Sequence, residues 1–256
     1  MHKKDTSWNA VAPWYDTLVE GAGSYQQEVI LPNILRLAGD IKGKKIFDLA
    51  CGQGFFAHKF SAAGAVVTGL DASDNLIEIA KKSSGGKGVP HFLTGTAESL
   101  PKELITGSFD LVVCILALQN IKELDATLGG VARALSAKGR FLIVLNHPAF
   151  RIPRRSEWGV DEKTSTQYRR IDGYLSESAA EISMNPSKKE SAVTYSFHRP
   201  LQVYMKMLAK HDFSITRLEE WISHKTSESG PRKQMEDRAR KEFPLFLFLE
   251  CTKGKI

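Results

Sequence analysis

Four residues at the ends of two apolar runs have types and a spacing that could bind a ligand. Asp48 follows a short apolar run, and Gly52 and Gly54 stand in the small-residue loop directly after it. Asp71 ends the next apolar run. Glycines let the backbone turn tightly and approach a ligand closely, and an acid at the end of a second strand can accept hydrogen bonds from ribose hydroxyls. The order strand, glycine loop, helix, strand and acid therefore predicts the first half of a nucleotide-binding α/β domain.

Asp48 distinguishes between two classes of cofactor. Residues 52–57 also fit the dinucleotide fingerprint G-x-G-x-x-A, in which a pyrophosphate binds at the helix N-terminus. A carboxylate shortly before that loop would repel a pyrophosphate, whereas it would attract a cation. The ammonium or sulfonium group of S-adenosylmethionine is such a cation. The sequence therefore favours S-adenosylmethionine over a nicotinamide dinucleotide.

Two loops carry a resemblance to a known family. Residues 48–54, DLACGQG, resemble motif I of the class I S-adenosylmethionine-dependent methyltransferases. The motif departs from the family pattern at Ala50, where glycine is commoner, although alanine is also small. Residues 95–101, GTAESLP, resemble the loop that brackets adenine, with Thr96 where the family often carries an acid. The resemblance covers about the first 146 residues. In style it is closest to the small-molecule group that includes the ubiquinone and menaquinone methyltransferases.

The resemblance also implies which residues contact the cofactor, S-adenosyl-L-methionine. Tyr15, followed by Asp16, resembles a family signature whose tyrosine closes over the methionine part of the cofactor. By the same resemblance, cofactor contacts are expected at Tyr15, Asp48, Ala50, Gly52, Gly54, Asp71, Ala72, Leu76, Thr96, Ala97, Glu98 and Cys114. No metal site is expected, because the three cysteines are scattered and no Cys and His cluster has a zinc-like spacing.

Apolar patterns further along the chain predict the remaining elements of an α/β domain. The predicted elements cover residues 108–114 (strand), 123–135 (helix), 138–144 (strand), a helix after Pro200, 213–218 (strand) and 244–251 (strand). The resemblance implies a seven-stranded, mostly parallel, doubly wound sheet in the order 3-2-1-4-5-7-6, with the last strand antiparallel. We expect residues 1–256 to form a single methyltransferase domain.

An insertion, residues 147–199, separates the fifth predicted strand from the following helix. Residues 167–175 and 192–197 look strand-like, and a polar turn lies between them. We therefore expect a small antiparallel flap over the carboxyl ends of the strands, where open α/β sheets bind ligands. Its aromatic residues and arginines suit a planar or anionic methyl acceptor. The same aromatic residues could instead form a small core of the flap itself.

Three residues of this insertion are candidates for the chemistry. Methyl transfer is an in-line displacement in which the cofactor carries the electrophile, so the protein must mainly align the nucleophile. If the acceptor must lose a proton, His147 or His198 could act as the base. Arg199 could clamp an anionic acceptor. A lone histidine, however, is more often structural than catalytic.

Composition and charge agree with a cytoplasmic enzyme that acts on a small molecule. The chain has 256 residues, of which 42% are hydrophobic and 25% charged, and a net charge of +6. The scattered cysteines suggest reduced, buried thiols, and the most apolar run, residues 243–249, is too short to span a bilayer. A basic chain can bind nucleic acid, but no appended RNA-binding module is recognisable. We therefore expect a small-molecule acceptor.

The preferred function is transfer of a methyl group from S-adenosylmethionine to an oxygen, nitrogen or carbon nucleophile of a small molecule. Three alternatives stay open: an NAD-linked oxidoreductase, an RNA methyltransferase, and a methyltransferase-like protein that binds the cofactor without catalysis. Asp48 and the missing second parallel half of the sheet disfavour the oxidoreductase. The acids Asp48 and Asp71 argue against a loss of cofactor binding, but not against a loss of catalysis.

Overall fold

A seven-stranded mixed sheet forms the centre of the protein, which we describe from a computed structural model. The structure describes residues 8–9, 21, 23–83, 88–183 and 193–254. The sheet has the order β3-β2-β1-β4-β5-β11-β10. Its strands are β1 (Lys45–Leu49), β2 (Val66–Asp71), β3 (His91–Thr94), β4 (Phe109–Ile115), β5 (Leu135–Asn146), β10 (Phe213–Trp221) and β11 (Phe246–Lys253).

The predicted topology is confirmed. Strands β1 to β5 pair in parallel, and β11 inserts antiparallel between β5 and β10. With β10 and β11 as the sixth and seventh strands of the sheet, the order is 3-2-1-4-5-7-6. The strand order reverses at the boundary between β1 and β4, which is where open α/β sheets bind ligands.

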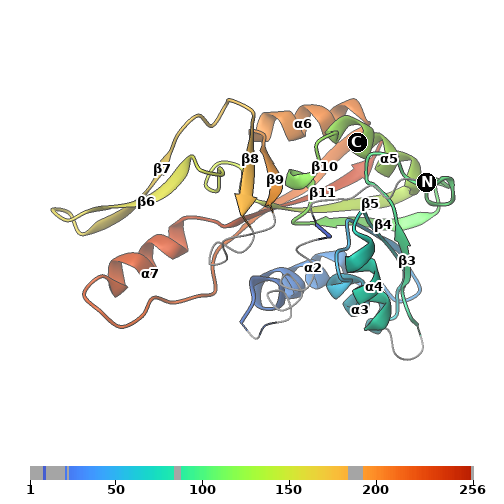
Figure 1. Ribbon diagram of the computed structural model, residues 1–256, viewed down its shortest axis with the longest axis horizontal. Helices are drawn as coiled ribbons and strands as arrows, with labels where there is room; N and C mark the ends of the chain where they lie inside the picture. The colour runs from blue at the N-terminus through green and yellow to red at the C-terminus, as the bar shows by residue number, and fades with distance from the viewer. Residues whose placement is uncertain (1–7, 10–20, 22, 84–87, 184–192, 255–256) are drawn as a thin grey trace.

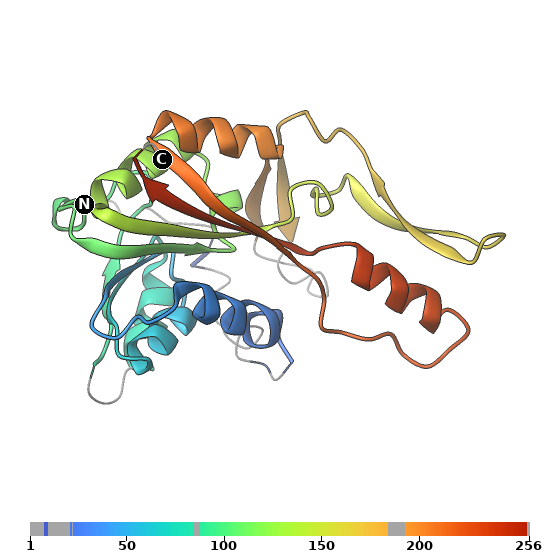
Figure 2. The same cartoon turned by 180° about the vertical axis from the view of Figure 1, so that it is seen from behind.

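Helices cover both faces of the sheet (Figure 1 and Figure 2). On one face lie a π-helical turn, η1, and three helices, and on the other face lie two helices. The first group is η1 (Gln26–Ile30), α2 (Leu31–Ala38), α3 (Phe55–Ala62) and α4 (Asp74–Lys82). The second group is α5 (Leu124–Ala134) and α6 (Leu201–Lys210). The predicted helices at residues 123–135 and after Pro200 are thus present.

Two hydrophobic cores result from the alternation of side chains along the central strands. Ile46 of β1 and Val113 of β4 pack with α2 and α3, whereas their neighbours Phe47 and Val112 pack with α5. All four side chains are fully buried. Strands buried on both faces appear as continuous apolar runs, as parallel strands in α/β proteins do.

The insertion after β5 is antiparallel, as predicted, but its strand pairing differs from the prediction. Strand β6 (Ser156–Asp161) pairs with β7 (Thr166–Ile171), and β8 (Ser178–Ser183) pairs with β9 (Val193–His198). The two predicted strands correspond to β7 and β9, and they do not pair with each other. Their true partners, β6 and β8, were missed because their sequences, SEWGVD and SAAEIS, lack a clear apolar alternation.

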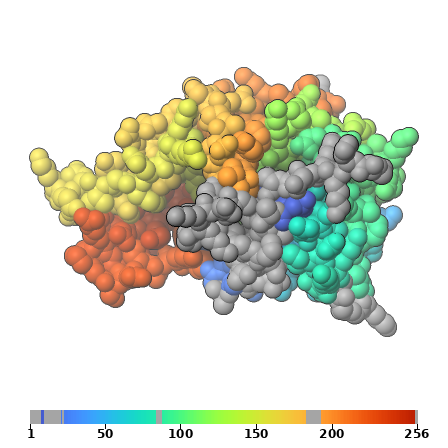
Figure 3. Space-filling model, in the orientation of Figure 1, coloured from blue at the N-terminus to red at the C-terminus, as the bar shows by residue number. Residues whose placement is uncertain are grey.

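A distal lobe extends from one end of the sheet. It consists of the β6–β7 hairpin and α7 (Lys233–Glu242), which lie side by side in both ribbon views and form one projecting mass in Figure 3. Arg232 pairs with Glu162 of the hairpin at 2.6 Å, and the Trp158 ring meets the Phe243 ring edge to face at 5.2 Å. Helix α7 was not predicted from the sequence, because Ala239 is its single buried residue. Within the described residues, no helix has the length and apolarity that a bilayer span requires.

Candidate cofactor pocket at the carboxyl ends of the strands

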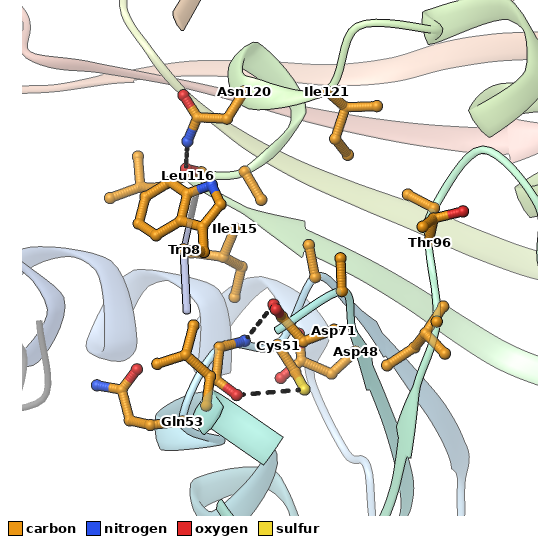
Figure 4. A pocket seen from close by; sticks show the side chains of 18 of the residues that line it. Trp8, Asp48, Cys51, Gln53, Asp71, Thr96, Ile115, Leu116, Asn120 and Ile121 are labelled. Atoms are coloured by element: carbon orange, nitrogen blue, oxygen red, sulfur yellow. Dashed lines mark hydrogen bonds between the residues drawn. The ribbon is translucent and has the colours of Figure 1, made fainter. Parts of the chain in front are cut away.

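A pocket of about 340 Å³ lies where the order of the parallel strands reverses. Loops that follow four adjacent strands line it: residues 50–53 after β1, 71–72 after β2, 95–98 after β3 and 115–117 after β4. These loops meet at one edge of the sheet because parallel strands all end there. Figure 4 shows the side chains that enter the pocket from both sides.

The loop after β1 adopts a tight turn that is tied to the loop after β2. Ala50 and Gly52 have positive φ angles of 58° and 56°. The two carboxylate oxygens of Asp71 accept hydrogen bonds from the backbone N–H groups of Gly52 and Ser73, each at 2.9 Å (Figure 4 shows the first). Asp71 therefore fixes the position of both loops, and each oxygen keeps a further lone pair for a ligand hydroxyl.

Asp48 has a carboxylate oxygen with no partner. The residue is 2% exposed, and its Oδ2 atom has no hydrogen-bond donor within the described part of the chain. Burial, together with the nearby charge of Asp71, raises the pKa of Asp48 to about 7. An unpaired carboxylate in a low-dielectric pocket is costly, and a cationic ligand would remove that cost. The site thus fits a ligand with a positive charge close to Asp48.

Gln53 supplies a hydrogen-bond donor, whereas Asp48 supplies an acceptor. Its side chain lines the pocket, it is 4% exposed, and its Nε2 donor has no acceptor among the described residues. An unpaired acceptor on Asp48 and an unpaired donor on Gln53 together suit a zwitterion, such as the amino-acid end of S-adenosylmethionine. The sequence analysis did not select Gln53. Its position between two glycines was the only available signal.

The wall beyond β4 is apolar and aromatic. Ile115 and Leu116 line the pocket at the end of β4, and Leu116 has a φ of 53°, which is unusual for a leucine. Asn120 donates a hydrogen bond to the Leu116 carbonyl at 3.4 Å. Tyr195 and Phe197 of β9 also line the pocket, so the insertion does reach the site. Trp8 lies over the same region in Figure 4.

Comparisons with known proteins agree with this geometry. Residues 47–143 match the model of a methyltransferase domain. A demethylmenaquinone methyltransferase from Lactococcus lactis subsp. lactis is 31% identical over 156 residues, which cover 58% of this chain and 61% of that protein. A ubiquinone biosynthesis O-methyltransferase from Aromatoleum aromaticum is 25% identical over 129 residues, or 50% and 54% of the two chains. The chain thus spans just over half the length of these curated relatives.

The fold comparison covers more of the chain. The crystal structure of an S-adenosylmethionine-dependent methyltransferase from Mesorhizobium loti superimposes with a TM-score of 0.70 at 24% identity, over 91% of this chain and 99% of that one. Residues 47–143 thus match a methyltransferase domain, and the chain has the fold of the class I methyltransferases. The fold that the sequence predicted is confirmed, and the domain match supports the predicted family and its cofactor, S-adenosylmethionine.

Most of the predicted cofactor contacts are brought together in the pocket. The predicted residues that line it are Asp48, Ala50, Gly52, Asp71, Ala72, Leu76, Thr96, Ala97 and Glu98. Tyr15 lies outside the described residues.

The structure does not place Gly54 or Cys114 in the lining of the pocket. Gly54 begins α3 with a φ of 82°, and a Cβ there would lie 2.7 Å from the Phe92 ring. It therefore faces the packing behind the loop. Cys114 is fully buried in the sheet, where its side chain belongs to the core that contains α5.

The three candidates for chemistry also lie outside the lining. His147 Nε2 contacts Glu220 Oε1 at 2.7 Å, and its Nδ1 accepts weak bonds from two backbone N–H groups. Burial lowers the pKa of His147, while Glu220 acts in the opposite direction. Because Nδ1 accepts, Nε2 carries the proton in the neutral ring and donates it to Glu220. This histidine fastens β5 to β10.

His198 and Arg199 also have hydrogen-bond partners away from the pocket. Side chains alternate along β9, so Tyr195 and Phe197 face the pocket while His198 points to the other side. His198 Nε2 contacts the Tyr174 carbonyl at 2.7 Å. Arg199 donates to the carbonyls of residues 121 and 122 at 3.0 and 2.6 Å. The Arg199 bonds fasten the insertion to the body of the protein, and the His198 bond joins two parts of the insertion.

Proposed function

We propose that this chain transfers a methyl group from S-adenosylmethionine to a small, planar acceptor held between the cofactor and the aromatic residues of β9. The observation that supports it most is the pairing of two features in one pocket. An unpaired carboxylate oxygen on Asp48 suits the cationic cofactor, and Tyr195 and Phe197 from the insertion form the opposite wall.

The proposal assigns a role to each polar residue of the pocket. Asp71 would accept hydrogen bonds from the ribose hydroxyls, because its two oxygens are already oriented by Gly52 and Ser73. Asp48 and Gln53 would hold the charged amino-acid end. Thr96 lies in the loop on the other side and would contact the adenine. When bound, the cofactor supplies a methyl group activated by its sulfonium.

The lining indicates what kind of acceptor would fit. Rings at Trp8, Tyr195 and Phe197, together with Ile121, offer flat apolar surface, and Lys122 is the cation of the lining. No histidine lines the pocket among the described residues. We therefore favour an acceptor that is nucleophilic without a histidine base, such as an acidic phenol, a hydroquinone or an amine. The names of the two curated relatives, which concern quinone compounds, support the same class.

The proposal extends to the whole chain. Residues 1–256 would act as one methyltransferase domain, in which the insertion at residues 147–199 covers the acceptor. A cytoplasmic location is supported by Cys51, Cys114 and Cys251, which are all free and buried, as in proteins of a reducing compartment.

Two measurements test the proposal. Calorimetry with S-adenosylhomocysteine and with NAD should show binding of the first only, and tight NAD binding would favour the oxidoreductase instead. Methyl transfer from labelled S-adenosylmethionine should then be assayed against hydroquinones, phenols, amines and thiols, with bulk RNA as a comparison. We expect transfer to at least one small aromatic acceptor. Transfer to RNA alone, or cofactor binding without any transfer, would contradict the proposed acceptor class.

A further inference from the structure

A second cavity, of about 240 Å³, lies between the distal lobe and the body of the protein. No described residue lines both this cavity and the cofactor pocket. Its lining includes Tyr25, Phe150, Arg151, Trp158, Arg169 and Phe243. The cavity is therefore built from residues before α2, from the start of the insertion, from both strands of the β6–β7 hairpin and from the end of α7.

Two guanidinium groups enter this cavity without a carboxylate partner. Arg151 donates to the neutral amide oxygen of Asn146 at 2.6 Å. Arg169 donates to the Phe150 carbonyl at 2.9 Å and to the Ser156 hydroxyl at 2.8 Å. Within the part of the chain that the structure describes, neither arginine lies within ion-pair distance of an acid.

The electrostatics of the pair favour an anion. Desolvation by the surrounding protein lowers the pKa of Arg151 although the residue is partly open to solvent; Tyr25 acts in the opposite direction, and the charge of Arg169 lowers the pKa further. Burial likewise lowers the pKa of Arg169, although Glu157 acts in the opposite direction. Glu157 itself pairs with Arg170 at 3.4 Å. Among the residues that the structure describes, no acid lines the cavity, so the two like charges repel each other until an anion lies between them.

Aromatic rings form the remaining walls, and they support one another. The Phe243 ring meets both Trp158 and Phe150 edge to face, with centroid distances of 5.2 and 5.5 Å. The guanidinium of Arg169 lies over the Trp158 ring at 5.1 Å. These contacts hold the rings in place before any ligand arrives. A cavity of about 150 Å³ with apolar walls is large enough for benzene, so this cavity has room for one ring and a charged group.

We propose that the second cavity is a binding site for a small aromatic anion, such as a single-ring carboxylate. Arginine binds carboxylates in a bidentate manner, and the rings of Trp158, Phe150 and Phe243 would pack against the planar part. The site is separate from the cofactor pocket, so its occupant is not the group that receives the methyl. Tyr25 lines this cavity and the next residue, Gln26, lines the cofactor pocket, which places the two sites on either side of one chain segment.

Calorimetry with the full chain tests this site directly. Benzoate is the probe, benzamide is the uncharged comparison and acetate is the comparison without a ring. We expect saturable benzoate binding with a dissociation constant on the order of 1 mM or below. Benzamide and acetate should each bind at least about tenfold more weakly. Benzamide lacks the charge that pairs with the arginines, and acetate lacks the ring that contacts the aromatic walls. Equal binding of benzoate and benzamide would overturn the proposed role of the arginines.

Variants locate the probe. Arg151→Gln should reduce benzoate affinity by about tenfold or more, while Arg155→Gln, which removes the same charge from the same segment outside the cavity, should not. Both variants should bind S-adenosylhomocysteine like the parent, and this binding also shows that they fold. Saturating S-adenosylhomocysteine should not displace benzoate. Displacement would place benzoate in the cofactor pocket. An equal loss of benzoate affinity in both variants would mean that only the net charge of the protein matters. Either result would overturn the proposal.

Discussion

Asp48 and Asp71 enter the same pocket but have different partners. Asp71 accepts two backbone hydrogen bonds, whereas one oxygen of Asp48 accepts none from the residues that the structure describes. Asp71 is therefore oriented before any ligand binds, and Asp48 is left in an environment that a cation would improve. The sequence predicted both acids as cofactor contacts from their spacing around the glycine loop. It could not predict that Asp71 also holds that loop, because this depends on the Gly52 N–H pointing toward β2.

Removal of the Asp71 carboxylate should weaken cofactor binding. Hydrogen bonds that involve a charged group contribute about 1.5–3 kcal/mol, so Asp71→Ala should reduce S-adenosylhomocysteine affinity by about tenfold or more. Part of this loss would come from the loop at Gly52, which Asp71 holds. Isothermal titration calorimetry measures the change, and Glu78→Ala, an exposed acid on α4, is the matched control. An unchanged affinity would remove Asp71 from the ribose site.

The two small residues of the glycine loop should respond in opposite ways to substitution. Gly54→Val places a β-branched side chain at a φ of 82°, with its Cβ 2.7 Å from the Phe92 ring. Strain and overpacking of this kind each cost about 1–3 kcal/mol. Ala50 has a φ of 58°, which glycine adopts freely, so Ala50→Gly should change the free energy of unfolding by less than about 1 kcal/mol.

Urea denaturation of both variants, together with S-adenosylhomocysteine binding, tests this contrast. Gly54→Val should be clearly less stable and should not bind, whereas Ala50→Gly should bind like the parent. A stable Gly54→Val protein with normal affinity would mean that α3 can move away from β3 without disturbing the pocket.

Strand β9 shows how the insertion connects packing with the site. Its alternation places Thr194, Ser196 and His198 inside and turns Tyr195 and Phe197 toward the cofactor pocket. The central sheet could be predicted because its apolar runs follow a nucleotide-binding pattern. The orientation of β9 could not, because its buried face carries the polar residues Thr194, Ser196 and His198, the reverse of the usual arrangement with apolar side chains inside. The role of His198 as a base stays a prediction, and its side chain lies on the face of β9 opposite to Tyr195 and Phe197.

Substitutions at two adjacent residues of β9 test the roles of its two faces separately. Phe197→Ala should lower the methylation rate while S-adenosylhomocysteine affinity stays near the parent value, because the ring lines the acceptor side of the pocket. His198→Ala should mainly lower the free energy of unfolding, by about 1–3 kcal/mol, because it leaves the Tyr174 carbonyl without its partner. Steady-state methylation kinetics and chemical denaturation measure the two effects. A rate loss of 10²-fold or more in a folded His198→Ala protein would support its role as a base.

Over the whole molecule, two cavities lie on either side of the segment that leads into α2. The cofactor pocket belongs to the sheet that the family shares, and the second cavity belongs to the distal lobe of β6, β7 and α7. The lobe was not predictable, because the α7 sequence KQMEDRARKE has no apolar face and is held at its ends by contacts such as Arg232 with Glu162. Such contacts connect residues that are 70 positions apart in the sequence.

The unpaired carboxylate of Asp48 should make the stability of the free protein depend on pH. Its pKa in the folded protein is about 7, compared with 3.8 for an unperturbed aspartate. Between these values the folded state binds more protons than the unfolded state, so the contribution of Asp48 to the free energy of unfolding falls as pH rises from 5 to 8. At 1.36 kcal/mol for each pKa unit, the loss is on the order of 2 kcal/mol. Asp48→Asn lacks this carboxylate and should not show this loss of stability between pH 5 and pH 8.

Urea denaturation at pH 5 and pH 8 tests this linkage as a difference between the parent and Asp48→Asn, which cancels the titration of His147 and of other distant groups. The parent should lose stability relative to the variant as pH rises, so that Asp48→Asn is the more stable of the two at pH 8.

Affinity for S-adenosylhomocysteine should change in the opposite direction, since its ammonium group requires the ionised carboxylate. It should fall up to tenfold for each pH unit below about 7 in the parent, and Asp48→Asn should bind weakly at every pH. If the parent and Asp48→Asn respond equally to pH, in both stability and affinity, then Asp48 stays ionised in the free protein. Another group of the protein would then already stabilise its negative charge.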